Sequence, residues 1–74
     1  MARFELLQGV ELTEDAPAHG VKSGAAATIV FVFDHPEEAY ELEVVGKNGE
    51  TVAQFPVTPK QIRPRSGQDE KRDR

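Results

Sequence analysis

The chain has 74 residues, 38% hydrophobic and 30% charged, which is enough for one small domain and no more. It contains no cysteine, which excludes disulfides and thiolate metal sites and makes a cytoplasmic location the expectation for so small a domain. Residues 1–64 carry five basic and ten acidic side chains, a net charge of −5, which argues against nucleic-acid binding. We see no apolar run long enough for a signal peptide or a membrane span.

Short apolar segments separated by turn-forming residues predict five strands, at 6–12, 28–33, 39–45, 51–57 and 62–63. The segment 28–33 has β-branched and aromatic residues on both faces, so we expect a strand covered on both sides, with Phe31 and Phe33 in the core. In the segment 39–45, apolar and acidic residues alternate. This period of two predicts that Leu42 and Val44 point into the core while Glu41 and Glu43 point outward.

The connections between these strands carry their own signals. The turn-rich loop at 13–24 is long for so small a domain, and long loops are often functional. Asn48 and Gly49 suit the positive φ angles of a tight hairpin. Thr58 followed by Pro59 predicts one helical turn before the last strand, with Thr58 as its N-cap.

This order of elements predicts an all-β fold, a small SH3-like barrel of about five short strands with one helical turn before the last strand. A short open β-meander is the main structural alternative. We place the barrel domain at residues 1–64. Residues 65–74 contain no apolar side chain, so we expect a disordered charged tail there.

Residues 10–24, VELTEDAPAHGVKSG, are similar to the opening of small bacterial proteins of the DUF4926 family. The segments ATIV, AYELEV, GET and QIRP, at 27–30, 39–44, 49–51 and 61–64, follow in the family's order. This resemblance implies an SH3-like barrel akin to KOW-type domains, and a protein partner such as an enzyme or toxin encoded nearby. It supplies no activity. The chain departs from the family at Ala27, where the family has glycine.

The residues that could carry chemistry do not form a recognisable catalytic set. His19 and His35 are the only histidines, and both lie in predicted turns; we interpret them as exposed loop residues rather than metal ligands. Ser23 lies near His19, but Ser23 and Gly24 are more typical of a turn than of a nucleophile. We therefore predict no enzyme activity, no cofactor and no metal site, and the sequence does not identify a small-molecule ligand.

Two functions remain open at this point. The first is a protein-interaction module, an accessory or immunity-like subunit that meets a basic partner surface through Glu14, Asp15, Glu41 and Glu43. The second is a KOW-like module associated with nucleic acid or the ribosome. The acidic domain makes nucleic acid the less favoured partner. The second function rests on fold analogy and on the basic residues Lys60, Arg63, Arg65, Lys71, Arg72 and Arg74.

Overall fold

Five antiparallel strands form one sheet in the computed structural model, which describes residues 3–46 and 48–65. The elements are β1 (Gly9–Leu12), η1 (Pro17–His19), β2 (Ala26–Phe33), β3 (Ala39–Val45), β4 (Thr51–Val57), η2 (Pro59–Gln61) and β5 (Ile62–Pro64), where η marks a turn of 3-10 helix. The strand order is β4-β3-β2-β1-β5, so the last strand pairs with the first, whereas a simple meander would place it beside β4. The all-β class, the five strands and the helical turn before the last strand are confirmed. The barrel comparison stays a prediction.

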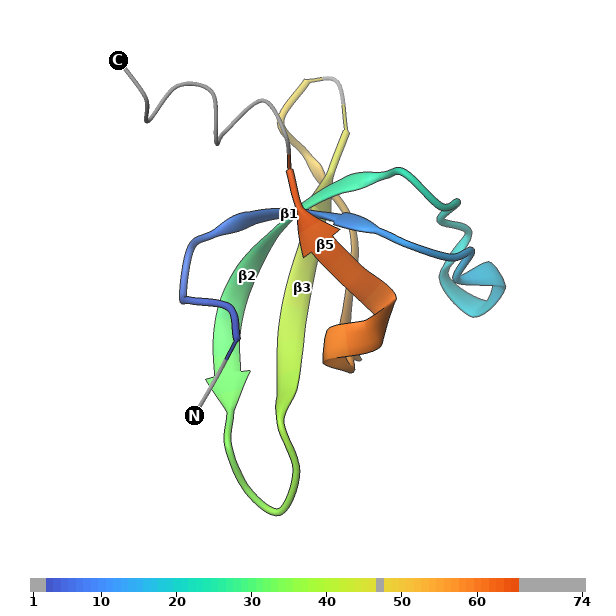
Figure 1. The fold of residues 1–74 in the computed structure, drawn as a ribbon. Helices are drawn as coiled ribbons and strands as arrows, with labels where there is room; N and C mark the ends of the chain where they lie inside the picture. The colour runs from blue at the N-terminus through green and yellow to red at the C-terminus, as the bar shows by residue number, and fades with distance from the viewer. Residues whose placement is uncertain (1–2, 47, 66–74) are drawn as a thin grey trace.

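The core is built from side chains of all five strands. In Figure 1, β2 and β3 run side by side, and the paired strands β1 and β5 lie near one end of that pair. Within the described residues, no helix is long and apolar enough to cross a membrane. The buried residues are Phe4, Val10, Leu12, Val21, Ala27, Ile29, Tyr40, Leu42, Val44, Phe55, Val57 and Ile62.

Strand β3 follows the predicted alternation. Leu42 is fully buried and Val44 nearly so, while Glu41 and Glu43 occupy the alternate positions and each hydrogen-bonds to a β4 side chain. The phenol oxygen of Tyr40 accepts hydrogen bonds from the backbone N–H groups of Arg3 and Phe4, at 2.9 and 3.1 Å. The inward face of β3 therefore also anchors the N-terminal segment.

The predicted turns around β4 are confirmed. The N–H of Gly46 donates to the carbonyl of Glu50 at 2.8 Å, and Gly49 has a φ of 85°, which favours glycine. The N–H of Thr58 donates to the side-chain oxygen of Gln61 at 2.9 Å, which fixes the start of η2. Strand β4 lies at the edge of the sheet, where Pro56 can be accommodated without a ladder N–H.

The first strand is shorter than predicted. It begins at Gly9 rather than at Leu6, because the N–H of Gln8 donates to the carbonyl of Glu5 and closes a turn. Leu7 in that turn has a φ of 68°, which a strand residue cannot adopt. Leu6 and Leu7 are consequently exposed instead of contributing to the strand.

The prediction that Phe31 and Phe33 belong to the core is wrong. Their side chains are 54% and 38% exposed. The cause is a β-bulge, because Ile29 pairs with Leu42 and Phe31 with Glu41, which leaves Val30 as an extra residue. The extra residue shifts the alternation by one position, so the side chains after it face the opposite way.

Candidate functional site

The loop that joins β1 to β2 is fastened to η2. We call residues 13–25 the first loop. The N–H of Thr13 donates to the carbonyl of Gln61 and its hydroxyl donates to the carbonyl of Lys60, both at 2.9 Å. The side-chain amide of Gln61 donates to the carboxylate of Glu14 at 3.0 Å. One end of the first loop is therefore held against the helical turn before the last strand.

The first loop is also ordered by its own contacts. Ala16 and Val21 form a two-way backbone bridge, with N–H to O distances of 2.7 and 3.2 Å. The N–H of Ser23 donates to the carboxylate of Asp15 at 2.8 Å and so joins two parts of the loop that lie eight residues apart. Gly20 ends η1 with a φ of 69°, a left-handed conformation that suits glycine. The loop thus presents its side chains from a fixed backbone.

A pocket of about 280 Å³ lies between the first loop, the end of β4 and η2, and we call it the loop pocket. The imidazole of His19 stacks on the ring of Phe55, with centroids 4.1 Å apart and an angle of 5° between the planes. Phe55 is a core residue, so the exposed His19 ring covers it from outside. The lining residues are Leu12, Glu14, Asp15, Ala16, Pro17, Ala18, His19, Phe55, Pro56, Val57 and Gln61.

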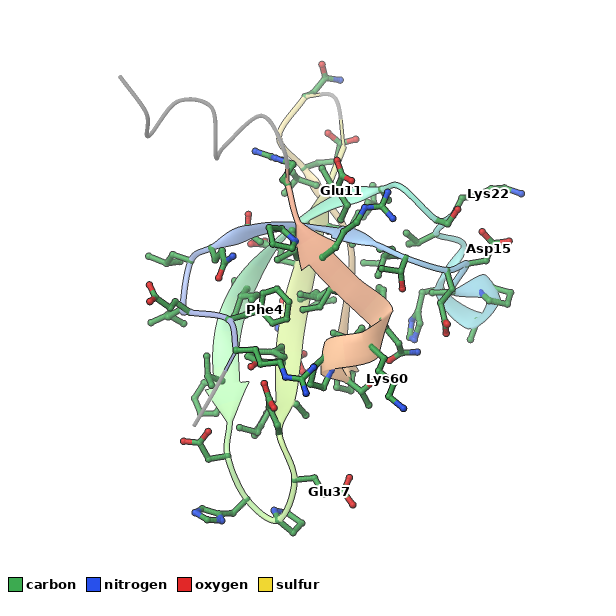
Figure 2. The ribbon with its side chains drawn as sticks, in the orientation of Figure 1. Phe4, Glu11, Asp15, Lys22, Glu37 and Lys60 are labelled. Atoms are coloured by element: carbon green, nitrogen blue, oxygen red, sulfur yellow. The ribbon has the colours of Figure 1, made fainter. Side chains whose placement is uncertain are left out.

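The loop pocket is acidic at its margin and apolar at its base. Glu14 and Asp15 are exposed lining residues, while Leu12, Phe55 and Val57 are buried ones. Its volume falls just below the range of about 300–1,000 Å³ typical of small-molecule sites, so it suits a side chain better than a large cofactor. Figure 2 shows Asp15 on the first loop, well away from Glu37 in the turn between β2 and β3.

A second hollow lies on the outer face of the sheet, and we call it the outer hollow. It has a volume of about 490 Å³ and is open to solvent. Sequence reasoning missed its aromatic residues, because a bulge leaves no mark in an apolar run such as 28–33. The lining residues are Val30, Phe31, Phe33, Glu41 and Gln54.

The structure divides the four predicted partner-binding residues between two surfaces. Glu14 and Asp15 line the loop pocket, and Glu41 lines the outer hollow. Glu43, two residues along β3 from Glu41, accepts a hydrogen bond from the hydroxyl of Thr51. Pro56 pairs with Glu41 across the β3–β4 ladder and also lines the loop pocket. The two surfaces therefore adjoin at the edge strand β4.

The two histidines lie in separate parts of the described structure. His35 is exposed in the turn between β2 and β3, apart from the loop pocket that His19 lines. Among residues 3–46 and 48–65, no three His, Asp or Glu side chains are grouped so that they could hold a metal ion. The hydrogen bond from Tyr40 lowers the pKa of Glu38, and burial raises the pKa of Tyr40. That pair anchors the N-terminal segment rather than lining either hollow.

Comparison with known proteins identifies the family of the chain from its sequence. The model of the family described as "Domain of unknown function (DUF4926)" matches residues 6–64. No curated protein and no solved structure matches the chain. The matched range runs from just before β1 to the end of β5 and includes both hollows. The chain therefore belongs to the DUF4926 family.

Proposed function

We propose that this protein is a non-catalytic interaction module, an accessory or immunity-like subunit that binds a basic segment of a protein partner at the loop pocket. One observation carries the proposal: Glu14 and Asp15 line a pocket whose loop is already fixed by hydrogen bonds. A prearranged loop loses little conformational entropy on binding, so more of the contact energy appears as affinity.

The chemistry of the loop pocket favours a lysine or arginine side chain of the partner. Among the described residues, each of the two carboxylates accepts one hydrogen bond through one oxygen, and its second oxygen can accept another. The flat His19 ring and the prolines beside it offer an apolar surface for the stem of a long basic side chain. Arginine fits best, because a planar guanidinium can stack on a ring and bind a carboxylate at the same time.

A nucleic-acid partner fits these observations less well. Carboxylates on the candidate surfaces repel phosphates, and the net charge of −5 over residues 1–64 acts in the same direction. Arg63, one of the basic residues on which that alternative rests, is paired with Glu11 at 3.0 Å. The absence of cysteine supports a cytoplasmic setting for the proposed complex.

The proposal is tested by comparing which proteins are retained by matched variants. Tagged wild-type protein, a Glu14→Gln/Asp15→Asn variant and an Asp34→Asn/Glu37→Gln variant are incubated with lysate of the organism that encodes the chain. Both variants lose two charges, but only the first loses them at the loop pocket. Quantitative mass spectrometry then identifies proteins retained by the wild type and by the control variant but depleted from the loop variant.

The candidate partner is then purified and its affinity for each variant is measured directly. We expect the loop variant to bind at least about tenfold more weakly than the control variant, because a buried charge contact costs several kcal/mol when one member is removed. Equal binding by both variants would exclude the loop pocket as the contact surface. Retention of RNA that grows stronger when Glu14 and Asp15 are neutralised would favour the nucleic-acid alternative.

A further inference from the structure

The β-bulge at Val30 gives the outer face of the sheet an apolar centre. Val30 lines the outer hollow together with Phe31 and Phe33, and the two phenyl rings lie 4.7 Å apart at an angle of 54°. Isolated exposed apolar side chains are ordinary in soluble proteins, but adjacent aromatic rings that line one hollow are typical of a contact surface. In a domain this small, two phenylalanines that face outward also reduce the apolar surface that the core can bury.

Acidic and polar groups border this apolar centre on one side. Glu41 pairs with Phe31 across the β2–β3 ladder, and the side-chain amide of Gln54 donates to the Glu41 carboxylate at 3.3 Å. Glu43 follows at the next outward position of β3 and accepts from the Thr51 hydroxyl. The strands β2, β3 and β4 contain no lysine, arginine or histidine. Among the described residues, these two carboxylates of β3 therefore accept hydrogen bonds from β4 side chains and form no ion pair.

We propose that the outer hollow is a second docking site, which binds a segment of a protein partner that carries large apolar side chains next to lysine or arginine. The apolar side chains would cover Phe31 and Phe33, and the basic groups would form ion pairs with Glu41 and Glu43. The proposal for this site rests on the bulge in β2 and on the absence of basic residues from β2, β3 and β4. It is therefore independent of the loop pocket.

Charge complementarity decides between this occupant and a second copy of the chain. A symmetric dimer through the outer face would bring the carboxylates of two copies together over strands that hold no cation. Like charges in a contact are strongly unfavourable, so a symmetric dimer through the outer face is disfavoured. The volume of the outer hollow, about 490 Å³, lies within the range of about 300–1,000 Å³ that is typical of ligand sites.

The site can be tested with synthetic peptides before any partner is known. Nitrogen-15-labelled full-length protein is titrated with a short peptide of alternating leucine and lysine, and amide shifts are followed by NMR. A serine–lysine peptide keeps the charge without the apolar groups, and a leucine–glutamate peptide keeps the apolar groups with the opposite charge. We expect saturable shifts for the leucine–lysine peptide centred on Val30, Phe31, Phe33 and Gln54, and much weaker binding of the other two.

Two variants test whether the rings of Phe31 and Phe33 make the contact with the peptide. Phe31→Ser/Phe33→Ser should lower the affinity for the leucine–lysine peptide by about tenfold or more, as expected for central aromatic contacts. Val52→Ser removes a comparably exposed apolar side chain, 53% accessible, from outside the outer hollow and should leave the affinity unchanged. Both substitutions are at exposed positions, and dispersed amide spectra confirm folding before the titration.

Three results would overturn the proposal. The first is equal binding of the serine–lysine or leucine–glutamate peptide, which would remove either the apolar or the charge requirement. The second is shifts confined to Glu14, Asp15, His19 and Gln61, which would support the loop pocket and reject the outer hollow. The third is concentration-dependent dimerisation in sedimentation experiments that Phe31→Ser/Phe33→Ser abolishes, which would make a second copy the occupant.

Discussion

Tyr40 combines three roles in one buried side chain. Its ring is fully buried and meets Phe4 edge to face, with centroids 5.4 Å apart. Its hydroxyl accepts from the N–H groups of Arg3 and Phe4 and donates to the carboxylate of Glu38. The carboxylate in turn accepts from the Arg3 N–H at 2.9 Å. This network joins the N-terminal segment to the start of β3.

Tyr40→Phe should therefore destabilise the domain while preserving its core packing. The substitution leaves the Phe4 N–H without its acceptor in a buried setting, and such a loss costs about 1–3 kcal/mol. Urea unfolding followed by circular dichroism measures the change in the free energy of unfolding. Thr28→Val, a surface change in the neighbouring strand, serves as a control. A Tyr40→Phe variant as stable as the wild type would mean that the N-terminal segment is not held by the phenol.

The same side chain should make stability fall at high pH. Burial, with the Glu38 hydrogen bond second, raises the pKa of Tyr40 above its ordinary value. A raised folded pKa gives stability that is complete below the unfolded pKa and is lost as the pH rises above it. Tyr40 is the only tyrosine and there is no tryptophan, so near-ultraviolet absorbance of tyrosinate reports this group alone. We expect it to ionise at higher pH in native protein than in urea-unfolded protein; identical titrations would contradict the burial.

At the scale of the elements, the bulge in β2 explains what sequence could and could not predict. Period-two alternation identified β3 correctly, because Glu41 and Glu43 mark its outer face. Strand β2 offers no such marker, since its residues are apolar on both faces and an extra residue changes nothing in the pattern. The partners across the ladder, Leu42 and Glu41, decide which way Phe31 faces.

The candidate site, too, could be predicted from the sequence only in part. The length of the first loop and its acidic residues made it a candidate site from sequence. The stacking of His19 on Phe55 was not foreseeable, because the two residues lie 36 positions apart and meet only when η1 packs beside β4. The hydrogen bond between Glu14 and Gln61 spans 47 positions and forms because β1 pairs with β5. Contacts between distant segments depend on strand order, which local patterns do not encode.

Deleting Val30 should be tolerated better than deleting Val32. Val30 has no partner in the β2–β3 ladder, so its removal yields a regular ladder with Phe31 and Phe33 still facing outward. We expect a loss of about 2 kcal/mol, the scale of one valine side chain. Deleting Val32, the partner of Tyr40, would force Phe33 toward the core. Thermal unfolding of the two deletions measures the difference, and equal loss would place the irregularity elsewhere.

At the scale of the whole molecule, residues 66–74 should be dispensable for folding. The predicted tail begins at residue 65, and all but Arg65 of it lies outside the described residues. The N–H of Arg65 donates to the carbonyl of Gly9 at 3.2 Å, whereas residues 66–74 include no apolar side chain that could stabilise a core. A chain ending at Arg65 should melt within about 2 °C of the full chain. A fall of several degrees in calorimetry would show that the segment packs.

The acidic character of the domain should also raise the rate at which a partner arrives. Replacing Glu14, Asp15, Glu41 and Glu43 with their amides removes four of the ten acidic groups in residues 1–64. Association with the partner identified by the pull-down should slow by about tenfold or more at low salt, because opposite charges steer encounter. The difference should shrink in 1 M salt, where the screening length falls to about 3 Å. Surface-based kinetics at two salt concentrations measures this, with His35→Gln as a control that leaves association unchanged. A four-residue variant that associates as fast as the wild type at low salt would show that these carboxylates do not face the partner.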